Sequence, residues 1–324
     1  MSSIRRAEKL AESGKVEEAY ELLSSRAEKG DGEAAMLLAQ WRMSGAVIRR
    51  DLGEARRLFG IAAEAGEELA EPAFIALLAN GAGGIGRKWG EALSRLRART
   101  DEASRAQADT LAAMELDAQG DPAQPPVAQQ LLQSPRVWKF PSFLSESECR
   151  YLRAMAKPLL QPSVVVHPQT GQMIQDPVRR STVAMFPFVE ENPVIHAINR
   201  RIAAATSTTY EQGEPLQILS YRRGEEYRQH SDALPGEPNQ RVLTFLVYLN
   251  DGYEGGETRF PSADFAFRGA TGDGLLFANV DRSGQPDRAA VHAGCPVDKG
   301  RKMLLSKWIR GAPMNLAGPP GRPL

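Results

Sequence analysis

The stretch YRRGEEYRQHSDAL, residues 221–234, places His230 and Asp232 two positions apart, just before an apolar run rich in β-branched and aromatic residues. Side chains two apart on an extended chain point to the same side, so this pair can converge on one metal ion. The same residues are also common in surface turns, which makes a lone His-x-Asp pair weak evidence for a metal site. A third ligand from elsewhere in the chain would decide between the two interpretations.

The composition limits the class of protein. The chain has 324 residues, enough for two domains of ordinary size. Hydrophobic residues make up 42% and charged residues 25%, the proportions of a globular protein. The formal net charge is zero, so no global field attracts nucleic acid or an anionic membrane, and we expect neither as a partner.

Targeting signals and cysteines give two further expectations. The first twenty residues lack the apolar core of a signal peptide, and no uninterrupted apolar run is long enough to span a bilayer. We therefore expect a cytoplasmic location. Cys149 and Cys295 are the only cysteines, and two distant thiols make neither a disulfide framework nor a cysteine-rich zinc site, so we expect both to be reduced and buried.

Residues 1–120 are rich in Ala, Glu, Leu and Arg, which predicts short helices. Glu-Ala pairs recur at positions 18, 54 and 91, and a second helix ending in glycine lies between successive pairs. A period of 36 to 37 residues with two helices per unit is typical of a helical solenoid. The region resembles Sel-like repeats of the tetratricopeptide type; a non-repetitive helical bundle is the alternative.

The chain changes character after a break rich in Pro, Gly and Asp at residues 117–126. We expect residues 121–134 to be a linker with a short helix at VAQQLLQS, and residues 135–312 to form a second domain. Two early helices and many short strands there favour a helix-backed β-barrel or double-sheet jelly roll. The predicted fold class is α + β: a helical solenoid followed by a double-stranded β-helix. Residues 313–324 have too little apolar content to pack, so we expect a mobile tail.

The histidines narrow the search for a third ligand. The chain has four, at positions 167, 196, 230 and 292. His196 lies in the amphipathic helix NPVIHAINRRI, where a structural role is expected, and His167 stays unassigned. His230 and His292 are 62 residues apart, but distant strands of a rolled sheet can be neighbours. Two imidazoles and one carboxylate form the facial triad of non-haem Fe(II) oxygenases, which leaves coordination positions open for a co-substrate and O₂.

Lys302 gives independent support. It stands ten residues after His292, on the next apolar strand, where it shares one face with Leu304, Ser306 and Trp308. A lysine that points into a barrel must meet an anion, because an unpaired ammonium there is too costly. A dicarboxylate co-substrate would supply that anion, with its 2-oxo-acid end on the iron and its far carboxylate at Lys302. The alternative is a solvated surface lysine.

These elements belong to a longer pattern. Residues 135–310 resemble the catalytic domain of prolyl 4-hydroxylases, in the 2-oxoglutarate and Fe(II)-dependent dioxygenase superfamily. The phrases that carry the resemblance stand in the family's order: FLSESEC, VRRS, NPVIHAINRRI, LQILSYRRGEEYRQHSD, RVLTFLVYLND, GGETRFP and HAGCPVDKGRKMLLSKWI. Together they are specific, although none is so alone.

The resemblance implies iron ligands and a co-substrate site. His230, Asp232 and His292 match the iron ligands of the family. Lys302 matches the basic residue that binds the far carboxylate of 2-oxoglutarate, and Tyr221 matches a tyrosine whose hydroxyl helps to hold that co-substrate.

Further matches concern the walls of the site. Tyr248 either lines the co-substrate pocket or is a core aromatic. Arg179 and Ser181 match an Arg-x-Ser element near the substrate groove, with a plain surface charge as the alternative for Arg179. Trp308 is expected to be structural. The segment HPQTGQMIQDPV, residues 167–178, stands where a substrate-covering loop is expected but has no close match.

The resemblance also implies an activity. Fe(II), 2-oxoglutarate and O₂ would together hydroxylate an unactivated C–H with release of succinate and CO₂, and ascorbate is a further candidate cofactor. We expect the substrate to be a prolyl residue of a protein or peptide that the helical repeats dock. Two alternatives stay open: a hydroxylase of a free amino acid or small metabolite, and a non-catalytic adaptor with a degenerate metal-binding barrel.

Overall fold

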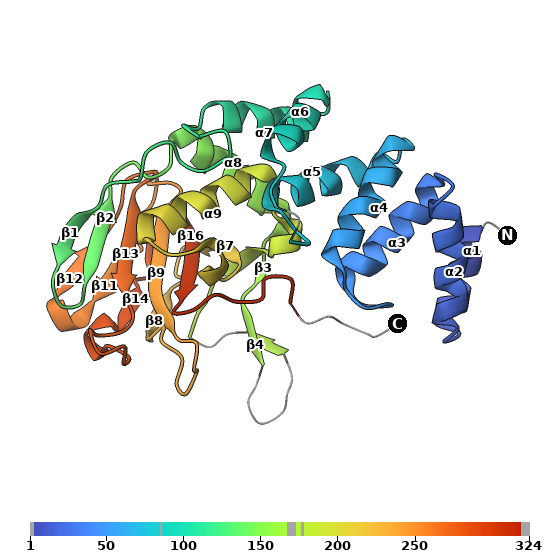
Figure 1. Cartoon of the computed structure of the whole chain (residues 1–324). Helices are drawn as coiled ribbons and strands as arrows, with labels where there is room; N and C mark the ends of the chain where they lie inside the picture. The colour runs from blue at the N-terminus through green and yellow to red at the C-terminus, as the bar shows by residue number, and fades with distance from the viewer. Residues whose placement is uncertain (1–2, 85, 167–172, 176–177, 319–324) are drawn as a thin grey trace. The chain divides into compact units, whose positions relative to one another are not determined.

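The computed structural model describes residues 3–84, 86–166, 173–175 and 178–318 (Figure 1). The chain divides into two compact units. The helical unit contains the residues up to Ala123, together with Pro187–Ile198 and the described residues from Asn315 onward. The sheet unit contains Gln124–Phe186 and Asn199–Met314. Within the described ranges, each helix is too short or too polar to cross a membrane.

The helical unit is built mainly from consecutive helices that pack on one another. Their bounds are α1 Ser3–Glu12, α2 Val16–Ala27, α3 Gly32–Ser44, α4 Leu52–Glu64, α5 Ala70–Asn80, α6 Trp89–Ala98 and α7 Glu102–Ala112. Asp31, Asp51 and Asp101 begin α3, α4 and α7, and each side chain accepts a hydrogen bond from the backbone N–H three residues on. Small buried residues such as Ala35 and Ala55 allow the helices to approach closely. The predicted helical region is therefore present.

The sequence period coincides with pairs of helices. The Glu-Ala pairs at positions 18, 54 and 91 fall in the first turns of α2, α4 and α6, that is, in every second helix. This placement is what a two-helix repeating unit requires. Assignment to the Sel-like class stays a prediction.

The helical unit also includes a segment from the middle of the chain. The sequence predicts two domains that follow one another, and this prediction does not contain such a segment. The short helix η2, Phe188–Glu190, and the first turns of α9, Pro193–Thr206, belong to it. Asn80 Nδ2 donates to the carbonyl of Phe188 at 3.0 Å, and the side chains of Phe188 and Val189 pack against the helical core. The helical unit therefore cannot be removed at residue 120 without uncovering apolar groups.

The strands of the sheet unit form two main sheets and two small pairs. The large sheet contains β1 Gln129–Leu132, β2 Val137–Phe140, β3 Gln161–Pro162, β6 Thr182–Phe186, β7 Leu216–Arg222, β9 Arg241–Tyr248, β13 Gly274–Ala278 and β16 Arg301–Arg310. The small sheet contains β8 Tyr227–His230, β11 Thr258–Phe260, β12 Phe265–Phe267 and β14 His292–Gly294. The separate pairs are β4 Val164–Val166 with β5 Met173–Gln175, and β10 Glu254–Gly255 with β15 Val297–Lys299.

The two main sheets share one core. The large sheet has the order β1-β2-β13-β9-β16-β7-β6-β3 with antiparallel neighbours throughout, and the small sheet has the order β12-β11-β14-β8. Leu246 and Leu304 from the large sheet meet Phe260 from the small sheet in a single apolar cluster. Two antiparallel sheets packed in this way form a jelly roll, which confirms the predicted fold class.

Helices cover the outer face of the large sheet (Figure 1). They are α8, Glu146–Ala156, and the second half of α9. Ser145 begins α8 with the predicted capping box: its hydroxyl accepts from the Glu148 N–H, and the Glu148 carboxylate accepts from the Ser145 N–H. Arg201 of α9 donates to Glu148 at 2.7 Å. Because β16 is covered on both faces, its residues 302–307 are all buried.

Two local predictions are wrong. VAQQLLQS does not form a helix, because residues Gln129–Leu132 pair with β2 as the edge strand β1, and this pairing outweighs the local helix propensity. Residues 313–318 are not too polar to pack: the Met314 N–H donates to the carbonyl of Glu211, and Ala317 lies against the helical core. Residues 319–324 of the expected tail lie outside the described residues.

Candidate active site

The pairing of β8 with β14 brings the two candidate histidines together. His230 ends β8 and His292 begins β14, and they are directly opposite each other in the antiparallel register. Asp232 follows β8 and reaches between them, with Oδ1 3.6 Å from His230 Nε2 and Oδ2 3.7 Å from His292 Nε2. All three ligand atoms lie within 4.8 Å of one another. The 62-residue separation in sequence is thus closed by one strand pair.

The hydrogen bonds of the two imidazoles prepare them for a metal. His230 Nδ1 lies 2.7 Å from the Arg228 carbonyl, and His292 Nδ1 lies 3.0 Å from the Ala290 carbonyl. A carbonyl only accepts, so Nδ1 carries a proton in each ring, and in the neutral form of the ring the lone pair is on Nε2, the atom that faces Asp232. Burial lowers the pKa of His292 to about 4, so this ring is neutral near pH 7.

Asp232 completes the triad as a buried carboxylate. Burial alone would raise its pKa, but His230, His292 and a hydrogen bond from Thr244 outweigh burial and hold the pKa well below the usual carboxyl range. Thr244 Oγ1 donates to Oδ2 at 2.6 Å. Two neutral imidazoles and an ionised carboxylate are the donor set of a non-haem Fe(II) site, so the residues fit that metal.

The other two histidines lie elsewhere. His196 is buried in the helical unit, where its Nδ1 lies 3.3 Å from Glu191 Oε2, a position that fits the structural role expected of it. His167, with most of the segment in which a substrate-covering loop was expected, lies outside the described residues.

Lys302 lies in the same cavity as the triad. It is 3% exposed, its Nζ donates to the Gly256 carbonyl at 2.7 Å, and it lies 5.6 Å and 5.3 Å from the ring centroids of Tyr221 and Tyr248. Burial lowers the pKa of Lys302 to about 8. Among the described residues, no carboxylate forms an ion pair with Nζ, which leaves the ammonium suited to an anionic ligand.

The two tyrosines proposed for the co-substrate site have different positions relative to the cavity. Tyr221 lines the cavity, and burial raises the pKa of its hydroxyl against the smaller opposing effects of Arg179 and Ser181. Tyr248 is fully buried behind the wall: its hydroxyl pairs with Thr258 Oγ1 at 2.8 Å and donates to a backbone carbonyl. Of the two readings of Tyr248, this position matches the core aromatic, and Thr258 lines the cavity in its place.

The two candidate substrate residues also differ. Arg179 lines the cavity, with its guanidinium 5.4 Å from the ring centroid of Tyr227. Ser181 is buried and its hydroxyl pairs with Ser163 at 2.8 Å; it does not line the cavity itself but lies beside the hydroxyl of Tyr221, which does. Tyr227 itself escaped prediction. In a regular strand Tyr227 and His230 would face opposite sides, but an irregularity in the β8–β14 register lets both face the cavity.

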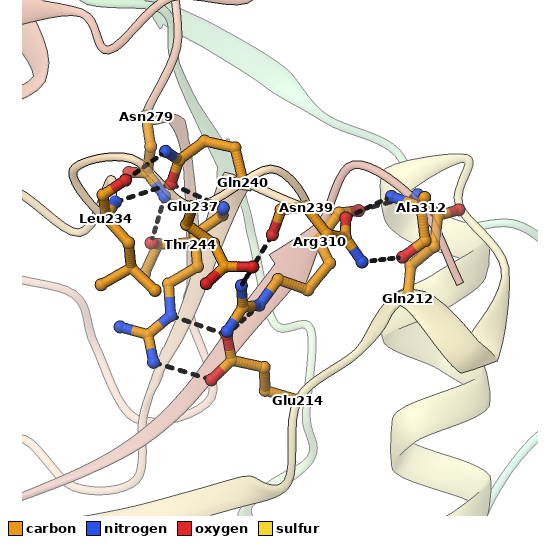
Figure 2. A network of polar contacts seen from close by, with 11 residues as sticks. Gln212, Glu214, Leu234, Glu237, Asn239, Gln240, Thr244, Asn279, Arg310 and Ala312 are labelled. Atoms are coloured by element: carbon orange, nitrogen blue, oxygen red, sulfur yellow. Dashed lines mark hydrogen bonds and ion pairs between the residues drawn. The ribbon is translucent and has the colours of Figure 1, made fainter. Parts of the chain in front are cut away.

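Trp308, expected to be structural, also lines the cavity. The Arg241 guanidinium lies 3.6 Å from its ring centroid and is held by Glu214 through two hydrogen bonds of 2.6 and 2.8 Å. Figure 2 shows that the carboxylate of Glu214 contacts two guanidinium groups, because it also receives that of Arg310. These partners come from strands distant in sequence, so no local pattern could have identified them.

The cavity is lined by side chains from both main sheets, and about 430 Å³ of empty space, open to solvent on one side, lies in and above it. Its charged groups are Asp232, Lys302 and Arg179. Its apolar walls are Leu219, Leu246, Leu304 and Trp308. A metal site and a buried ammonium in one largely apolar cavity define a metal-dependent site for an anionic co-substrate.

Comparison with known proteins agrees with this description. Residues 216–310, which hold the triad and Lys302, match the family model described as the 2OG-Fe(II) oxygenase superfamily. The chain is 38% identical to prolyl 4-hydroxylase 1 of Arabidopsis thaliana over 196 residues, which are 55% of this chain and 69% of that protein. It is 35% identical to the probable prolyl 4-hydroxylase 3 of the same plant over 199 residues, 54% of this chain and 69% of that protein.

One solved structure to which the chain is similar is the viral collagen prolyl hydroxylase of Paramecium Bursaria Chlorella virus-1 in its 2OG complex. It matches with a TM-score of 0.43 and 26% identity, over 54% of this chain and 96% of that chain. The family match and the three ligand residues show that the sheet unit is that of a 2-oxoglutarate-dependent dioxygenase, which uses Fe(II) and 2-oxoglutarate. Within that class, the sequence match shows that the chain belongs to the prolyl 4-hydroxylase family.

Proposed function

We propose that this protein hydroxylates a prolyl residue in a protein or peptide substrate. The observation that carries the proposal is the presence of the His230–Asp232–His292 triad and Lys302 in one cavity. Bound iron would supply the oxidative chemistry, in which O₂ and 2-oxoglutarate are consumed, succinate and CO₂ are released and a C–H bond is hydroxylated.

The chain's own residues bind and orient the reactants. The Nε2 atoms of His230 and His292 and the carboxylate of Asp232 would hold the metal, and the remaining coordination positions would be available to the co-substrate. The Lys302 ammonium binds the far carboxylate of 2-oxoglutarate, and the hydroxyl of Tyr221 assists. The apolar walls exclude water from the reacting centre.

The relatives and the position of the metal site in a cavity support the proposed substrate class. Two relatives that match the chain in sequence are named as a prolyl 4-hydroxylase and a probable prolyl 4-hydroxylase. The triad and Lys302 line a cavity instead of a flat surface, which favours a substrate that inserts a single side chain. Arg179 and Tyr227, stacked at the cavity, are the residues that we assign to substrate contact, and Ser181 supports them from behind.

The test is mass spectrometry of a cell extract incubated with the protein, Fe(II), 2-oxoglutarate and O₂. A single-oxygen gain on proline in one protein, absent with His230→Ala, would identify the substrate. Oxidation confined to a free amino acid or small metabolite would replace the prolyl assignment with that alternative. Absence of 2-oxoglutarate-dependent succinate formation with every candidate substrate would favour the non-catalytic adaptor. Running each reaction with and without ascorbate tests it as a cofactor.

We further propose that the helical unit docks the protein substrate and that the protein acts in the cytoplasm. Exposed lysines on the helical unit, Lys9, Lys15 and Lys29, offer a direct test of docking with the full-length protein. Cross-links from these lysines to the identified substrate would support docking, and cross-links confined to the sheet unit would contradict it. Cell fractionation tests the location: recovery of the protein with membranes would contradict it.

A further inference from the structure

A line of three hydrogen-bonded side chains leads away from the metal site. Asn279 Nδ2 donates to Thr244 Oγ1 at 2.9 Å, and Thr244 Oγ1 donates to Asp232 Oδ2 at 2.6 Å. Thr244 lies on β9, and Asn279 directly follows the neighbouring strand β13, so the large sheet places them side by side (Figure 2). All three side chains are at most 5% exposed. The three side chains therefore have little contact with solvent.

The proton positions in this line are fixed by its two ends. Thr244 has one hydroxyl proton, and the short contact with the Asp232 carboxylate requires that proton because a carboxylate only accepts. The Thr244 oxygen can then only accept from Asn279, so the Asn279 amide must present its N–H₂ group. The reverse amide orientation would leave Thr244 between two acceptors with one proton. Asn279 therefore sets the direction in which Thr244 donates.

The carbonyl oxygen of the Asn279 amide, Oδ1, differs from the N–H₂ group in its hydrogen bonding. Among the described residues, no donor lies within hydrogen-bond distance of Asn279 Oδ1, although the atom is buried. An unsatisfied buried carbonyl lowers the stability of the fold. An apolar side chain of the same size would avoid that cost, so stability does not explain an asparagine here. The N–H₂ group that donates to Thr244 explains why this residue is an asparagine.

The backbone beyond Asp232 is fixed separately. Gln240 Oε1 accepts from the Leu234 N–H at 2.6 Å, and Gln240 Nε2 donates to the Leu234 carbonyl at 2.6 Å, which closes the loop after Asp232 (Figure 2). The loop does not need Thr244 or Asn279 to hold its shape. The hydroxyl of Thr244 therefore acts on the carboxylate group itself.

We propose that Thr244 and Asn279 are positioning residues that hold Asp232 as a one-oxygen ligand of the metal. The Thr244 hydroxyl occupies Oδ2 and leaves Oδ1 for the metal, so the carboxylate takes one coordination position instead of two. The position kept open is one that the co-substrate or O₂ needs. The inference rests on the metal site of the proposed function, but it does not depend on which substrate is hydroxylated.

The experiment measures Co(II) binding by absorption spectroscopy, without 2-oxoglutarate or substrate. Thr244→Val keeps the shape of the side chain and removes the hydroxyl, whereas Thr244→Ser keeps the hydroxyl. We expect Thr244→Val to weaken Co(II) binding by about 10- to 100-fold and to shift its absorption bands, as loss of a residue that supports a metal ligand does. We expect Thr244→Ser to restore both. Thr258→Val is the matched control, because it removes a buried hydroxyl of the same cavity that bonds to Tyr248 instead of Asp232.

Asn279→Leu separates positioning from a structural role. We expect it to weaken Co(II) binding in the same direction, while thermal unfolding of the metal-free protein occurs at an unchanged or higher temperature because the unsatisfied Oδ1 is gone. A lower unfolding temperature with unchanged Co(II) affinity and bands, in either Asn279→Leu or Thr244→Val, would overturn the proposal. Suppose that the unchanged protein binds Co(II) and the variants behave as expected, but no hydroxylation is found. The proposed hydroxylase function then fails, whereas the role of Thr244 and Asn279 at the metal site stands. If the unchanged protein binds no Co(II), the proposed role of Thr244 and Asn279 fails.

Discussion

Tyr227 stacks on His230, with ring centroids 3.4 Å apart and planes inclined by 12°. The guanidinium of Arg179 lies 5.4 Å from the centroid of the same tyrosine ring. The imidazole of His230 is therefore held in two ways, by the Arg228 carbonyl at Nδ1 and by an aromatic ring against its face. A ligand fixed both in tautomer and in orientation loses little freedom when a metal binds.

The stack gives a first prediction. Tyr227→Leu removes the ring from the face of His230, whereas Tyr227→Phe keeps it. Aromatic pairs contribute about 0.5–1.5 kcal/mol beyond their buried area, so we expect Tyr227→Leu to weaken Mn(II) or Co(II) binding by roughly 2- to 12-fold. Isothermal titration of the metal measures this. Equal metal affinity in the Leu and Phe variants would show that the stack does not support His230.

A second prediction concerns the charge of Lys302. Hydrogen bonds to charged groups contribute about 1.5–3 kcal/mol, so Lys302→Met should weaken binding of 2-oxoglutarate by roughly 10- to 150-fold. The same change removes a buried ammonium, so the protein without co-substrate should become more stable, by on the order of 1 kcal/mol. Calorimetry with Mn(II) under nitrogen and thermal unfolding give the two values. Unchanged co-substrate affinity would mean that Lys302 does not meet the far carboxylate.

The pH dependence of co-substrate binding gives a third prediction. Burial lowers the pKa of Lys302 to about 8, so the ammonium is present below pH 8 and is lost above it. A bound carboxylate favours the charged form and raises this pKa, so 2-oxoglutarate affinity should be constant below pH 8 and fall about tenfold per pH unit above it. Lys302→Arg, which stays charged, is the control and should show no such fall. An equal fall in both proteins would assign the titration to another group.

The site illustrates what a sequence pattern can and cannot specify. His230 and Asp232 could be placed on one metal because their spacing matches the two-residue period of a strand. Tyr227 could not be placed there, because an irregularity in strand register changes the facing side and leaves no mark in the composition. Thr244 and Asn279 meet only through the pairing of β9 with β13, which is a property of the folded sheet.

In the fold, too, some features follow from the sequence pattern and others depend on contacts in the folded protein. Helix periodicity and glycine breaks identify the helical region, and the jelly roll follows from the order of short strands. The strand β1, Gln129–Leu132, was missed because four residues with helix propensity become a strand only when the edge of β2 is available. The inclusion of Pro187–Ile198 in the helical unit was missed for a similar reason, since it depends on contacts with residues far away in sequence.

The packing of Pro187–Ile198 within the helical unit gives a fourth prediction. A chain that starts at residue 121 lacks the helical core against which Phe188 and Val189 pack and the Asn80 amide that bonds to Phe188. We expect this shortened chain to bind a dye for exposed apolar surface and to unfold at a lower temperature than the full chain. Phe188→Ser with Val189→Ser should reduce dye binding in the shortened chain and destabilise the full one. Dye binding equal to that of the full chain would show that the segment does not need the helices.

The last prediction concerns Glu214, whose carboxylate receives both Arg241 and Arg310. The side chain of Glu214 is 11% exposed and those of the arginines are 16% and 15% exposed, so the three charges have little contact with water. Glu214→Gln keeps the shape and leaves two buried guanidinium groups without their carboxylate. Removal of one partner from a buried ion pair destabilises by about 3–5 kcal/mol, and we expect a loss of this order in the free energy of unfolding, measured with urea.

The matched control is Glu237→Gln. Glu237 is the second carboxylate near Arg310, at 3.6 Å, and its side chain is 39% exposed. Because an exposed pair contributes about 0–1 kcal/mol, we expect little change in stability from this variant. Arg241 also lies on the ring of Trp308 in the cavity wall, so Glu214→Gln should weaken substrate binding more than co-substrate binding, whereas Glu237→Gln should change neither. Equal stability losses in the two variants would mean that solvent reaches Glu214 and that the network does not support the cavity wall.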